Sequence, residues 1–266
     1  MRDLLILDPA FRRRFEEMAL NSAAAVIQYL GGHSVTRKGA TVLQAAIRFR
    51  DGSSENVFFK QYVHPAPAWS FVGRRSKARR EFENYGAFLR LGLPCAQTLA
   101  CGELRDRLGR LRRAFIITRA IPEAQNLIDF VQTHCPDRAT AASRKLRRDL
   151  ISRLAPMVSR MHQGSFFHND LVWRNILVTQ PPQGLPELWW IDCPRGRFAQ
   201  LLCGRLRLKD LALLDKGAAR HCTRAERLSF TKAYLGKTRL DAEVKRLART
   251  VVAYKHRRWR DEAAFG

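Results

Sequence analysis

The most evident absence in this sequence is a long apolar run, and the second is any paired spacing of its cysteines. No stretch of the 266 residues is long and apolar enough to span a bilayer. The apolar stretch within residues 1–9 is too short for a signal peptide, and acidic residues interrupt it, so we do not expect secretion. The six cysteines include no Cys-x-x-Cys pair, which argues against a zinc site or a disulfide framework and predicts reduced thiols.

Acidic residues are also scarce. The chain has 24 Asp and Glu against 48 Lys and Arg, a formal net charge of +24. A folded protein this basic attracts polyanions, and nucleic acid, anionic lipid head groups and phosphorylated sugars are all candidates. A solvated face explains any one basic cluster but is a poor explanation of six clusters spread along the chain. These clusters lie at residues 12–14, 74–80, 105–113, 144–148, 205–207 and 255–260.

The chain contains neither an internal repeat nor a low-complexity segment, and its 46% of hydrophobic residues supports a core for one domain or two lobes. Apolar runs bounded by turn residues predict strands at 41–50, 56–63 and 114–120. Helical periodicity predicts helices at 11–30, 74–91, 144–162, 208–220, 223–235 and 241–258. In the helix at 144–162, Leu154 and Val158 lie on the apolar stripe and Arg147 lies on the basic side.

Residues 168–192 hold the most informative pattern. Two short apolar strands, 176–178 and 188–191, are joined by a turn rich in proline and glycine and predict an antiparallel hairpin. In such a hairpin the start of the first strand lies opposite the end of the second, which brings Asn175 next to Asp192. With Asp170 one short loop away, these oxygen-bearing side chains suit Mg²⁺ and phosphoryl transfer to a hydroxyl group. An ordinary hairpin flanked by polar turn residues is the alternative.

Two charged residues stand out in the first part of the chain. Lys60 lies among aromatic residues of the second predicted strand. It is either an edge-strand residue that keeps the sheet soluble or a phosphate-binding cation held in a cleft. Glu81 borders the apolar face of the second predicted helix, where a buried carboxylate needs a partner. Lys60 is one candidate partner, and a surface ion pair with Arg74 or Lys77 is the alternative.

In this order and spacing, Lys60, Glu81, the motif His168-x-Asp170-x4-Asn175 and Asp192 resemble the protein-kinase-like fold. The chain is more closely similar to the bacterial lipopolysaccharide core sugar kinases (Kdo/WaaP-type), over roughly residues 40–236. The resemblance implies an α+β, two-lobed protein-kinase-like fold. A small β-rich N-lobe would span residues 1–118, and a larger helical C-lobe would span residues 119–266. The resembling segments are 58–62, 78–82, 91–94, 168–178, 190–192 and 209–214.

The resemblance implies a role for each matching residue of the second part. Asp170 would be the catalytic base that accepts or orients the proton of the acceptor hydroxyl. Asn175 and Asp192 would hold Mg²⁺ and through it the phosphates of ATP. His168 would be structural and brace the loop, while Asp210 would cap the loop backbone from its helix.

The resemblance also implies that the first part binds the nucleotide. Lys60 would bind the α- and β-phosphates of ATP and would pair with Glu81. Thr118 and Ala120 would offer backbone contacts to adenine. ATP and Mg²⁺ are therefore the expected cofactors.

The sequence departs from protein kinases in the groups that surround the phosphates. No Gly-x-Gly-x-x-Gly loop precedes Lys60, and only Gly31-Gly32 and Arg37-Lys38-Gly39 are candidates to cover the phosphates. Val172 stands where protein kinases carry a lysine two residues after the base. Arg174 is a candidate to supply that charge instead.

The expected function is an ATP- and Mg²⁺-dependent kinase that phosphorylates a sugar hydroxyl, of heptose or Kdo, in the lipopolysaccharide inner core. Little chain separates Asp192 from Asp210, which leaves no room for a peptide-docking segment, so a protein substrate is not expected. One alternative is an aminoglycoside-type small-molecule phosphotransferase, whose cationic acceptors disagree with the charge of this chain. The other is a non-catalytic kinase-fold module that binds a polyanion, against which the intact Asp170 and Asn175 argue.

The expected partners are the core glycolipid and the anionic surface of the inner membrane, which the protein would bind peripherally from the cytoplasmic side. The basic and aromatic residues of 254–260 suit a membrane-contacting helix end. They suit equally well a helix C-terminus whose cations complement the helix dipole. No nucleic-acid module is recognisable, so nucleic acid binding is not expected. No protein partner is predicted.

Overall fold

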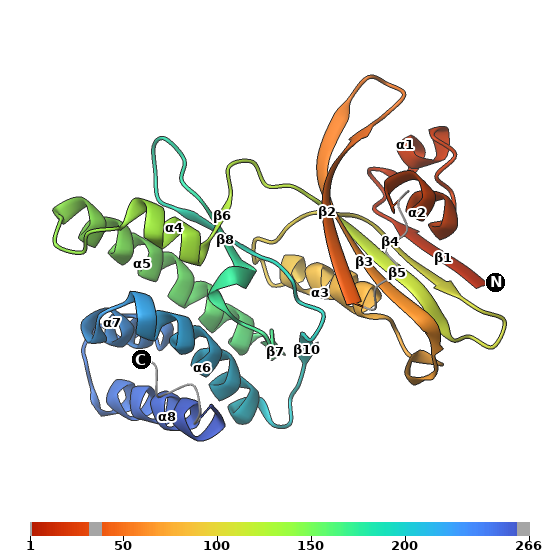
Figure 1. The fold of residues 1–266 in the computed structure, drawn as a ribbon. Helices are drawn as coiled ribbons and strands as arrows, with labels where there is room; N and C mark the ends of the chain where they lie inside the picture. The colour runs from red at the N-terminus through yellow and green to blue at the C-terminus, as the bar shows by residue number, and fades with distance from the viewer. Residues whose placement is uncertain (1, 32–38, 260–266) are drawn as a thin grey trace. The chain divides into compact units, whose positions relative to one another are not determined.

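The computed structural model describes residues 2–31 and 39–259, which form two compact units (Figure 1). The first unit comprises Met1–Gly86 and Ala96–Ile121, and the second comprises Ala87–Cys95 and Pro122–Gly266. The division falls after Ile121, whereas the sequence placed it after Thr118. Residues 87–95 join the second unit because the ring of Phe88 packs against aromatic rings of that unit.

A five-stranded antiparallel sheet forms the first unit, in the order β1-β4-β5-β3-β2. Lys60 lies on β3, opposite Val42 of β2 on one side and Ile116 of β5 on the other. The strand that carries Lys60 is therefore internal, and the edge-strand explanation for this lysine is wrong. The strands are β1 Arg2–Leu7, β2 Gly39–Arg48, β3 Ser54–Ala68, β4 Thr98–Arg105 and β5 Leu111–Arg119.

Helices α1 Arg12–Glu17 and α2 Ala23–Gly31 occupy the region for which the sequence predicted one helix. The single helix is wrong because Ala19 adopts a left-handed φ of 58°, and the hydroxyl of Ser22 then accepts the N–H of Ala25 at 3.1 Å and starts a new helix. Strand β1 stabilises the start of α2, because a carboxylate oxygen of Asp3 accepts the N–H of Ala23 at 2.8 Å. A short 3₁₀ helix, Trp69–Phe71, and helix α3, Lys77–Arg90, follow β3.

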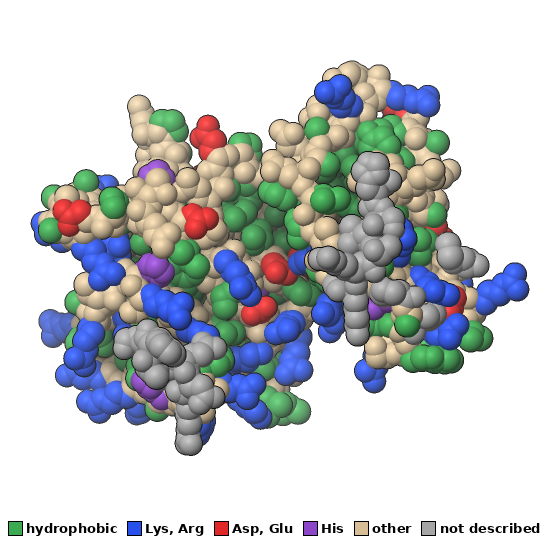
Figure 2. Space-filling view, viewed as in Figure 1, with side chains coloured by type: hydrophobic (Ala, Val, Ile, Leu, Met, Phe, Trp, Pro, Cys, Tyr) green, Lys and Arg blue, Asp and Glu red, His purple; other side chains and the backbone are tan. Residues whose placement is uncertain are grey.

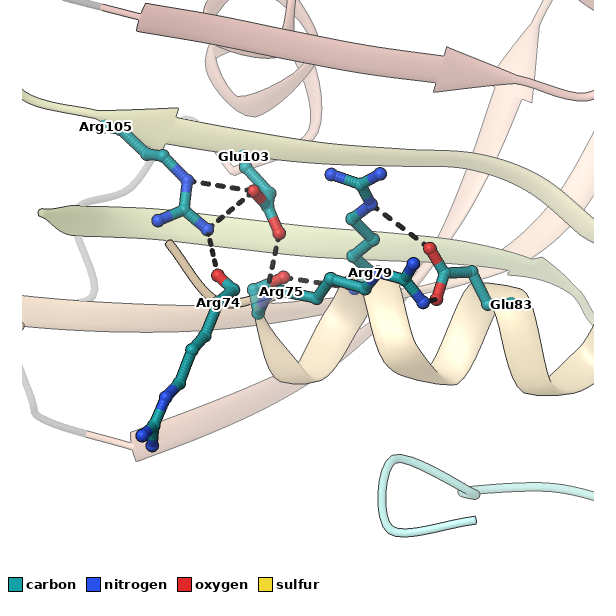
Figure 3. A network of polar contacts seen from close by, with 7 residues as sticks. Arg74, Arg75, Arg79, Glu83, Glu103 and Arg105 are labelled. Carbon is teal, nitrogen blue, oxygen red and sulfur yellow. Dashed lines mark hydrogen bonds and ion pairs between the residues drawn. The ribbon is translucent and has the colours of Figure 1, made fainter. Parts of the chain in front are cut away.

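A buried ion pair fixes the start of α3 on the sheet (Figure 3). Glu103 of β4 is 2% exposed, and it accepts hydrogen bonds from the N–H of Ser76 at 2.8 Å and from the guanidinium of Arg105 at 2.8 Å. Arg105 also donates to the carbonyl of Arg74 at 2.7 Å, one turn before the helix. Burial opposes ionisation of Glu103, but these hydrogen bonds outweigh it and lower the pKa of Glu103 below its ordinary value. The helix that carries Glu81 is thereby anchored at its N-terminus.

The second unit is mainly helical. Its small sheet has the order β6-β8-β9, and β7 pairs with β10. The helices are α4 Leu127–His134, α5 Ala141–Gln163, α6 Cys203–His221, α7 Arg224–Tyr234 and α8 Ala242–Arg258. The strands are β6 Gln125–Asn126, β7 Phe166–Phe167, β8 Ile176–Thr179, β9 Glu187–Trp190 and β10 Arg197–Phe198, with a 3₁₀ helix at Trp173–Asn175. Among the described residues, no helix is both long and apolar enough to cross a membrane.

Helix α5 differs from its predicted pattern at one residue. Leu154 and Val158 are buried as expected, but Arg147 is also buried, at 5% exposure. Its guanidinium donates to the carbonyl of His221 at 2.8 Å and to that of Cys135 at 3.3 Å. Placing Arg147 on the basic side was wrong because backbone carbonyls of neighbouring segments accept hydrogen bonds from its two terminal nitrogens inside the unit.

The aromatic residues near the end of α8 make contacts within the second unit. The ring of Trp259 lies 5.5 Å from Lys216 Nζ and 6.5 Å from the ring of Tyr254. Lys255 pairs with Asp215 at 2.7 Å. This geometry favours a packed helix end over a membrane-contacting one. Arg260 lies outside the described residues.

Candidate active site

One buried carboxylate fixes the loop that carries Asp170. Asp210, on α6, is fully buried, and its two carboxylate oxygens accept the backbone N–H groups of His168 and Asn169, both at 2.8 Å. Nε2 of His162 lies 3.4 Å from one of these oxygens. Two consecutive backbone N–H groups donate to one carboxyl group, so this contact holds the loop firmly. The cap predicted for Asp210 is therefore present.

The hairpin of β8 and β9 brings the two predicted metal ligands together. The strands pair antiparallel, and the N–H of Ile191 donates to the carbonyl of Asn175 at 3.1 Å. The predicted hairpin is confirmed, with Asn175 and Asp192 at the same end. The side-chain amide of Asn175 donates to the carbonyl of Asp170 at 2.9 Å. Because a carbonyl oxygen only accepts, this contact leaves the amide oxygen of Asn175 for a cation.

These oxygen ligands fit Mg²⁺. An amide oxygen and a carboxylate are hard ligands, and Mg²⁺ commonly takes only one or two protein ligands and completes its shell with phosphates and water. Within residues 2–31 and 39–259, no three His, Cys, Asp or Glu side chains gather into a metal cluster. A donor set of one amide oxygen and one carboxylate suits a Mg²⁺ ion that phosphates also bind.

His168 links the loop to the hairpin. It is fully buried, and its Nε2 lies 3.3 Å from the carbonyl of Ile191, so Nε2 carries the proton. Burial lowers the pKa of His168, against the opposing effect of nearby Asp210, and the ring is neutral at pH 7. The ring also stacks on Phe88, with centroids 6.1 Å apart. These contacts are those expected of a residue that braces the loop.

Asn169, next to the proposed base, and Asp192, a proposed metal ligand, adopt left-handed backbone conformations. Asn169 has a φ of 62° and Asp192 a φ of 54°. Such a conformation costs on the order of 1–3 kcal/mol, although Asn and Asp tolerate it better than most residues. The side-chain amide of Asn169 donates to the carbonyls of Phe167 at 3.2 Å and Arg195 at 3.3 Å, which offsets part of this cost. Backbone strain that the surroundings hold in place is typical of active sites.

The predicted pair of Lys60 and Glu81 is present in the first unit. Lys60 Nζ lies 3.0 Å from one oxygen of Glu81 and 3.3 Å from the other, and the hydroxyl of Tyr62 donates to Glu81 at 3.3 Å. Glu81 is 2% exposed. The alternative of a surface pair with Arg74 or Lys77 is therefore wrong, and a buried carboxylate fixes an ammonium group on an internal strand.

The two residues predicted to contact adenine lie at the end of β5. Thr118 is within the strand, opposite Phe58 and Thr98 of its neighbours. The N–H of Ala120 donates to the carbonyl of Asn56 at 2.8 Å. This N–H is therefore already used, and only the carbonyl of Ala120 is left for the predicted contact. The roles of both residues stay predictions.

Sequence reasoning missed Lys209, a cation beside the loop that carries Asp170. Its Nζ donates to the side-chain oxygen of Asn169 at 3.4 Å, and it forms no ion pair with any other described residue. Burial lowers the pKa of Lys209; Asp210 and Asp170 oppose this shift, and Arg195 adds to it. The sequence signal that could have found it is its position directly before Asp210, because the carboxylate that caps the loop also brings the adjacent lysine to that loop.

Sequence reasoning considered two other positions, Val172 and Arg174, for the positive charge that a lysine supplies in protein kinases. Val172 is half-buried and apolar, so it contributes no positive charge. Arg174 is exposed on the 3₁₀ helix, between buried Trp173 and buried Asn175. Of the candidates to cover the phosphates, Gly31 ends α2, while Gly32 and residues 37–38 lie outside the described residues.

An apolar cavity of about 650 Å³ lies among α5, α6, α7 and α8. Its lining includes Leu150, Leu154, Leu214, Phe230 and Val251, and it includes none of the predicted site residues. Because no predicted site residue lines it, the cavity is separate from the candidate active site.

Comparison with known proteins decides the family. Residues 37–234 match the lipopolysaccharide kinase (Kdo/WaaP) family. The chain belongs to this family. As a lipopolysaccharide kinase it is a phosphotransferase of the lipopolysaccharide core, and its family implies the use of ATP. No curated protein matches the chain.

The predicted α+β, protein-kinase-like fold of this lipopolysaccharide kinase is confirmed, and a solved structure of similar fold covers nearly the whole chain. A structure described as WaaP in complex with acyl carrier protein is similar over 97% of this chain and 98% of that one, with a TM-score of 0.66 and 23% sequence identity. A second structure, a Toxoplasma gondii specific rhoptry antigen kinase domain, matches 81% of this chain and 80% of that one, with a TM-score of 0.48 and 10% identity.

The same comparison corrects one prediction about this lipopolysaccharide kinase. The expectation of no protein partner is wrong, because WaaP, which shares the fold over nearly the whole chain, was solved with acyl carrier protein bound. The sequence showed no protein-docking motif. Docking surfaces are assembled from residues that are distant in sequence, so a short motif is a poor guide to them.

Proposed function

We propose that this kinase transfers the γ-phosphoryl group of ATP to a sugar hydroxyl of heptose or Kdo in the lipopolysaccharide inner core. Asp170 is the base, and Asn175 and Asp192 hold Mg²⁺. The observation that carries this proposal is the loop and hairpin of the second unit. Asp210 holds the backbone of the two residues before the base. The side-chain amide of Asn175 donates to the carbonyl of Asp170, so its oxygen is left for the metal.

In the proposed reaction, the acceptor hydroxyl gives its proton to the carboxylate of Asp170 as its oxygen bonds to the γ-phosphorus. The bond between this phosphorus and the β–γ bridging oxygen breaks, and ADP leaves with that electron pair. Bound Mg²⁺ would neutralise charge on the phosphate oxygens. The protein mainly positions the reactants and stabilises charge, because phosphoryl transfer asks for little covalent chemistry from its catalyst.

Lys60 and Glu81 support the nucleotide side of the proposal. The buried carboxylate holds the ammonium group at 3.0 Å, so Lys60 is ready to contact the α- and β-phosphates without losing much side-chain freedom on binding. Thr118 and Ala120 are proposed to contact adenine through the backbone.

Acyl carrier protein is the protein partner that we propose, because WaaP has been solved with such a protein bound. The acceptor is a glycolipid, and we place the kinase peripherally at the cytoplasmic face of the inner membrane. The net charge of +24 supports this placement, since basic residues are attracted to anionic lipid head groups.

The direct test is transfer of labelled γ-phosphate from ATP to core glycolipid purified from cells that lack this protein. The Asp170→Asn substitution keeps the shape of the side chain and removes the base, so we expect kcat to fall by about 10²- to 10⁴-fold with little change in KM for ATP. Asp137→Asn, an exposed residue of the loop before α5, is the matched control and should keep wild-type turnover. Unchanged turnover in Asp170→Asn would sink the assignment of the base.

A further inference from the structure

The turn formed by residues 198–202, from the last residue of β10 to the N-cap of α6, exposes three large apolar side chains. Phe198 is 53% exposed, Leu201 is 85% exposed and Leu202 is 65% exposed. Leu201 is the most exposed large hydrophobic residue in the described part of the chain. Single exposed apolar residues are ordinary, but three within one short turn form a patch that needs an explanation.

The backbone holds these side chains in place. Phe198 pairs with Phe166 in the β7–β10 ladder, and their rings meet edge to face with centroids 5.1 Å apart. The N–H of Ala199 donates to the carbonyl of Ser165 at 2.9 Å. Leu202 has a left-handed φ of 66° and stands at the N-cap of α6. A leucine in this conformation is strained, so a fixed fold, and not a loose loop, presents the patch.

The patch lies in an uninterrupted basic segment. Residues 194–209 contain five Lys and Arg and no acidic residue, and Arg195, Arg197, Arg205 and Arg207 are exposed. None of these four arginines forms an ion pair with a described residue. Hydrophobic side chains lie beside Lys and Arg side chains at the edge of the second unit where this turn is located (Figures 1 and 2).

We propose that the turn of residues 198–202, with its flanking arginines, is the membrane-binding element of this protein, and that its partner is an anionic bilayer surface. Apolar side chains enter the boundary between head groups and acyl chains, while arginines bind the lipid phosphates. Three side chains on a projecting turn are too few for a stable protein interface, which needs roughly 800 Å² from each partner.

The location of the turn gives this surface a role in the reaction, and this role rests on the proposed function. Strand β10 pairs with β7, and β7 leads directly into the loop of Asp170. Anchoring the turn in a membrane would therefore hold that loop next to the bilayer. The acceptor sugar of a glycolipid is tethered to the same surface.

The experiment is co-sedimentation of the full chain with vesicles of phosphatidylcholine, with or without roughly one third phosphatidylglycerol. We expect the double substitution Leu201→Ser and Leu202→Ser to weaken binding to the anionic vesicles about tenfold or more. The matched control, Leu108→Ser with Leu240→Ser, removes two other exposed leucines and should bind like the wild type. If the double variant does not fold, Leu201→Ser alone replaces it, because that side chain is almost fully exposed.

Binding of the double variant at wild-type strength would overturn the proposal. Loss of binding to acyl carrier protein with vesicle binding intact would also overturn it, because the turn would then be a protein-docking surface. Transfer to glycolipid in vesicles, divided by transfer to deacylated core oligosaccharide in solution, should fall in the double variant and stay constant in the control. A wild type that phosphorylates neither acceptor would refute the proposed function and leave the binding result interpretable.

Discussion

At the scale of single residues, buried partners position the charged groups of this kinase. Glu81 fixes Lys60 on an internal strand, and Asp210 fixes the backbone on the side of Asp170. These contacts were predictable because each residue occupies a fixed place in a known motif. The contact of Lys209 was not predictable in this way, because it joins residues that are forty positions apart and belongs to no motif.

Substitutions of Lys209 test whether its charge acts during transfer. Lys209 has no described ion pair, and its one hydrogen bond goes to a neutral amide, so we expect its charge to act on the transferred phosphoryl group. We expect Lys209→Met to lower kcat by about 10²-fold, as loss of a preorganised electrostatic group does. Lys209→Arg should keep much of the activity.

The glutamine variant separates charge from hydrogen bonding. Lys209→Gln retains a donor for Asn169 but has no charge, so it should lose as much kcat as Lys209→Met. Arg220→Ala, at the exposed end of the same helix, is the control. Wild-type kcat in Lys209→Gln would mean that the lysine only positions Asn169.

At the scale of elements, strong local signals decided which helices and strands could be predicted. Strong periodicity and turn residues predicted the β8–β9 hairpin and helix α7, whose Thr223–Glu226 capping box is present. Strands β1 and β4 escaped prediction. Strand β1 is held by pairing with β4, and β4 also pairs with β5; this pairing leaves no mark in the local sequence.

Two glycines of α6 give opposite predictions for the same substitution. A Cβ on Gly217 would overlap the indole ring of Trp173, which is held by its hydrogen bond to the carbonyl of Leu214 at 2.9 Å. We expect Gly217→Ala to lower the free energy of unfolding by about 1–2 kcal/mol, because overpacking outweighs the gain in helix propensity. It should also lower activity, because Trp173 shares the 3₁₀ helix with Asn175.

Gly204→Ala is the matched control, because nothing lies within 4 Å of its added Cβ. This variant should be neutral or more stable by up to about 1 kcal/mol. Urea denaturation of both variants measures the difference. Equal stability of the two variants would contradict the packing of Gly217 against Trp173.

The Glu103–Arg105 pair predicts a pH dependence of stability. The pKa of Glu103 in the folded protein lies below its ordinary value of 4.5, so the ionised carboxylate stabilises the fold above that pH. This stabilisation is lost as the pH falls from about 4.5 through the folded-state pKa. We expect Glu103→Gln to lower the free energy of unfolding by about 3 kcal/mol at pH 7, because Arg105 loses its counter-charge.

The difference between Glu103→Gln and the wild type should shrink as the pH falls below 4.5. Urea denaturation at pH 7, 5 and about 4 measures it. Glu123→Gln, an exposed residue, should show no such convergence. A difference that stays constant over this range would contradict an ionised, stabilising Glu103.

At the scale of the whole molecule, charge was the most informative property of the sequence. A net charge of +24 favoured an anionic acceptor and an anionic membrane, and the match to the lipopolysaccharide kinase family agrees with such an acceptor. Charge alone did not locate the surface that we propose to bind the membrane. The exposure of Leu201 and the packing of Trp259 depend on tertiary structure, so the sequence offered residues 254–260 as one candidate and did not single out residues 198–202.

The most direct measurement of the central claim is the mass of core oligosaccharide from cells whose only copy of this protein carries Asp170→Asn, compared with cells carrying the wild type. We predict that the mutant core lacks one phosphate on an inner-core heptose or Kdo, and that tandem mass spectrometry places the lost phosphate on that sugar. Asp137→Asn cells should keep the phosphate. A fully phosphorylated core in Asp170→Asn cells, with the variant present at wild-type abundance, would contradict the assignment of this loop as the centre of phosphoryl transfer.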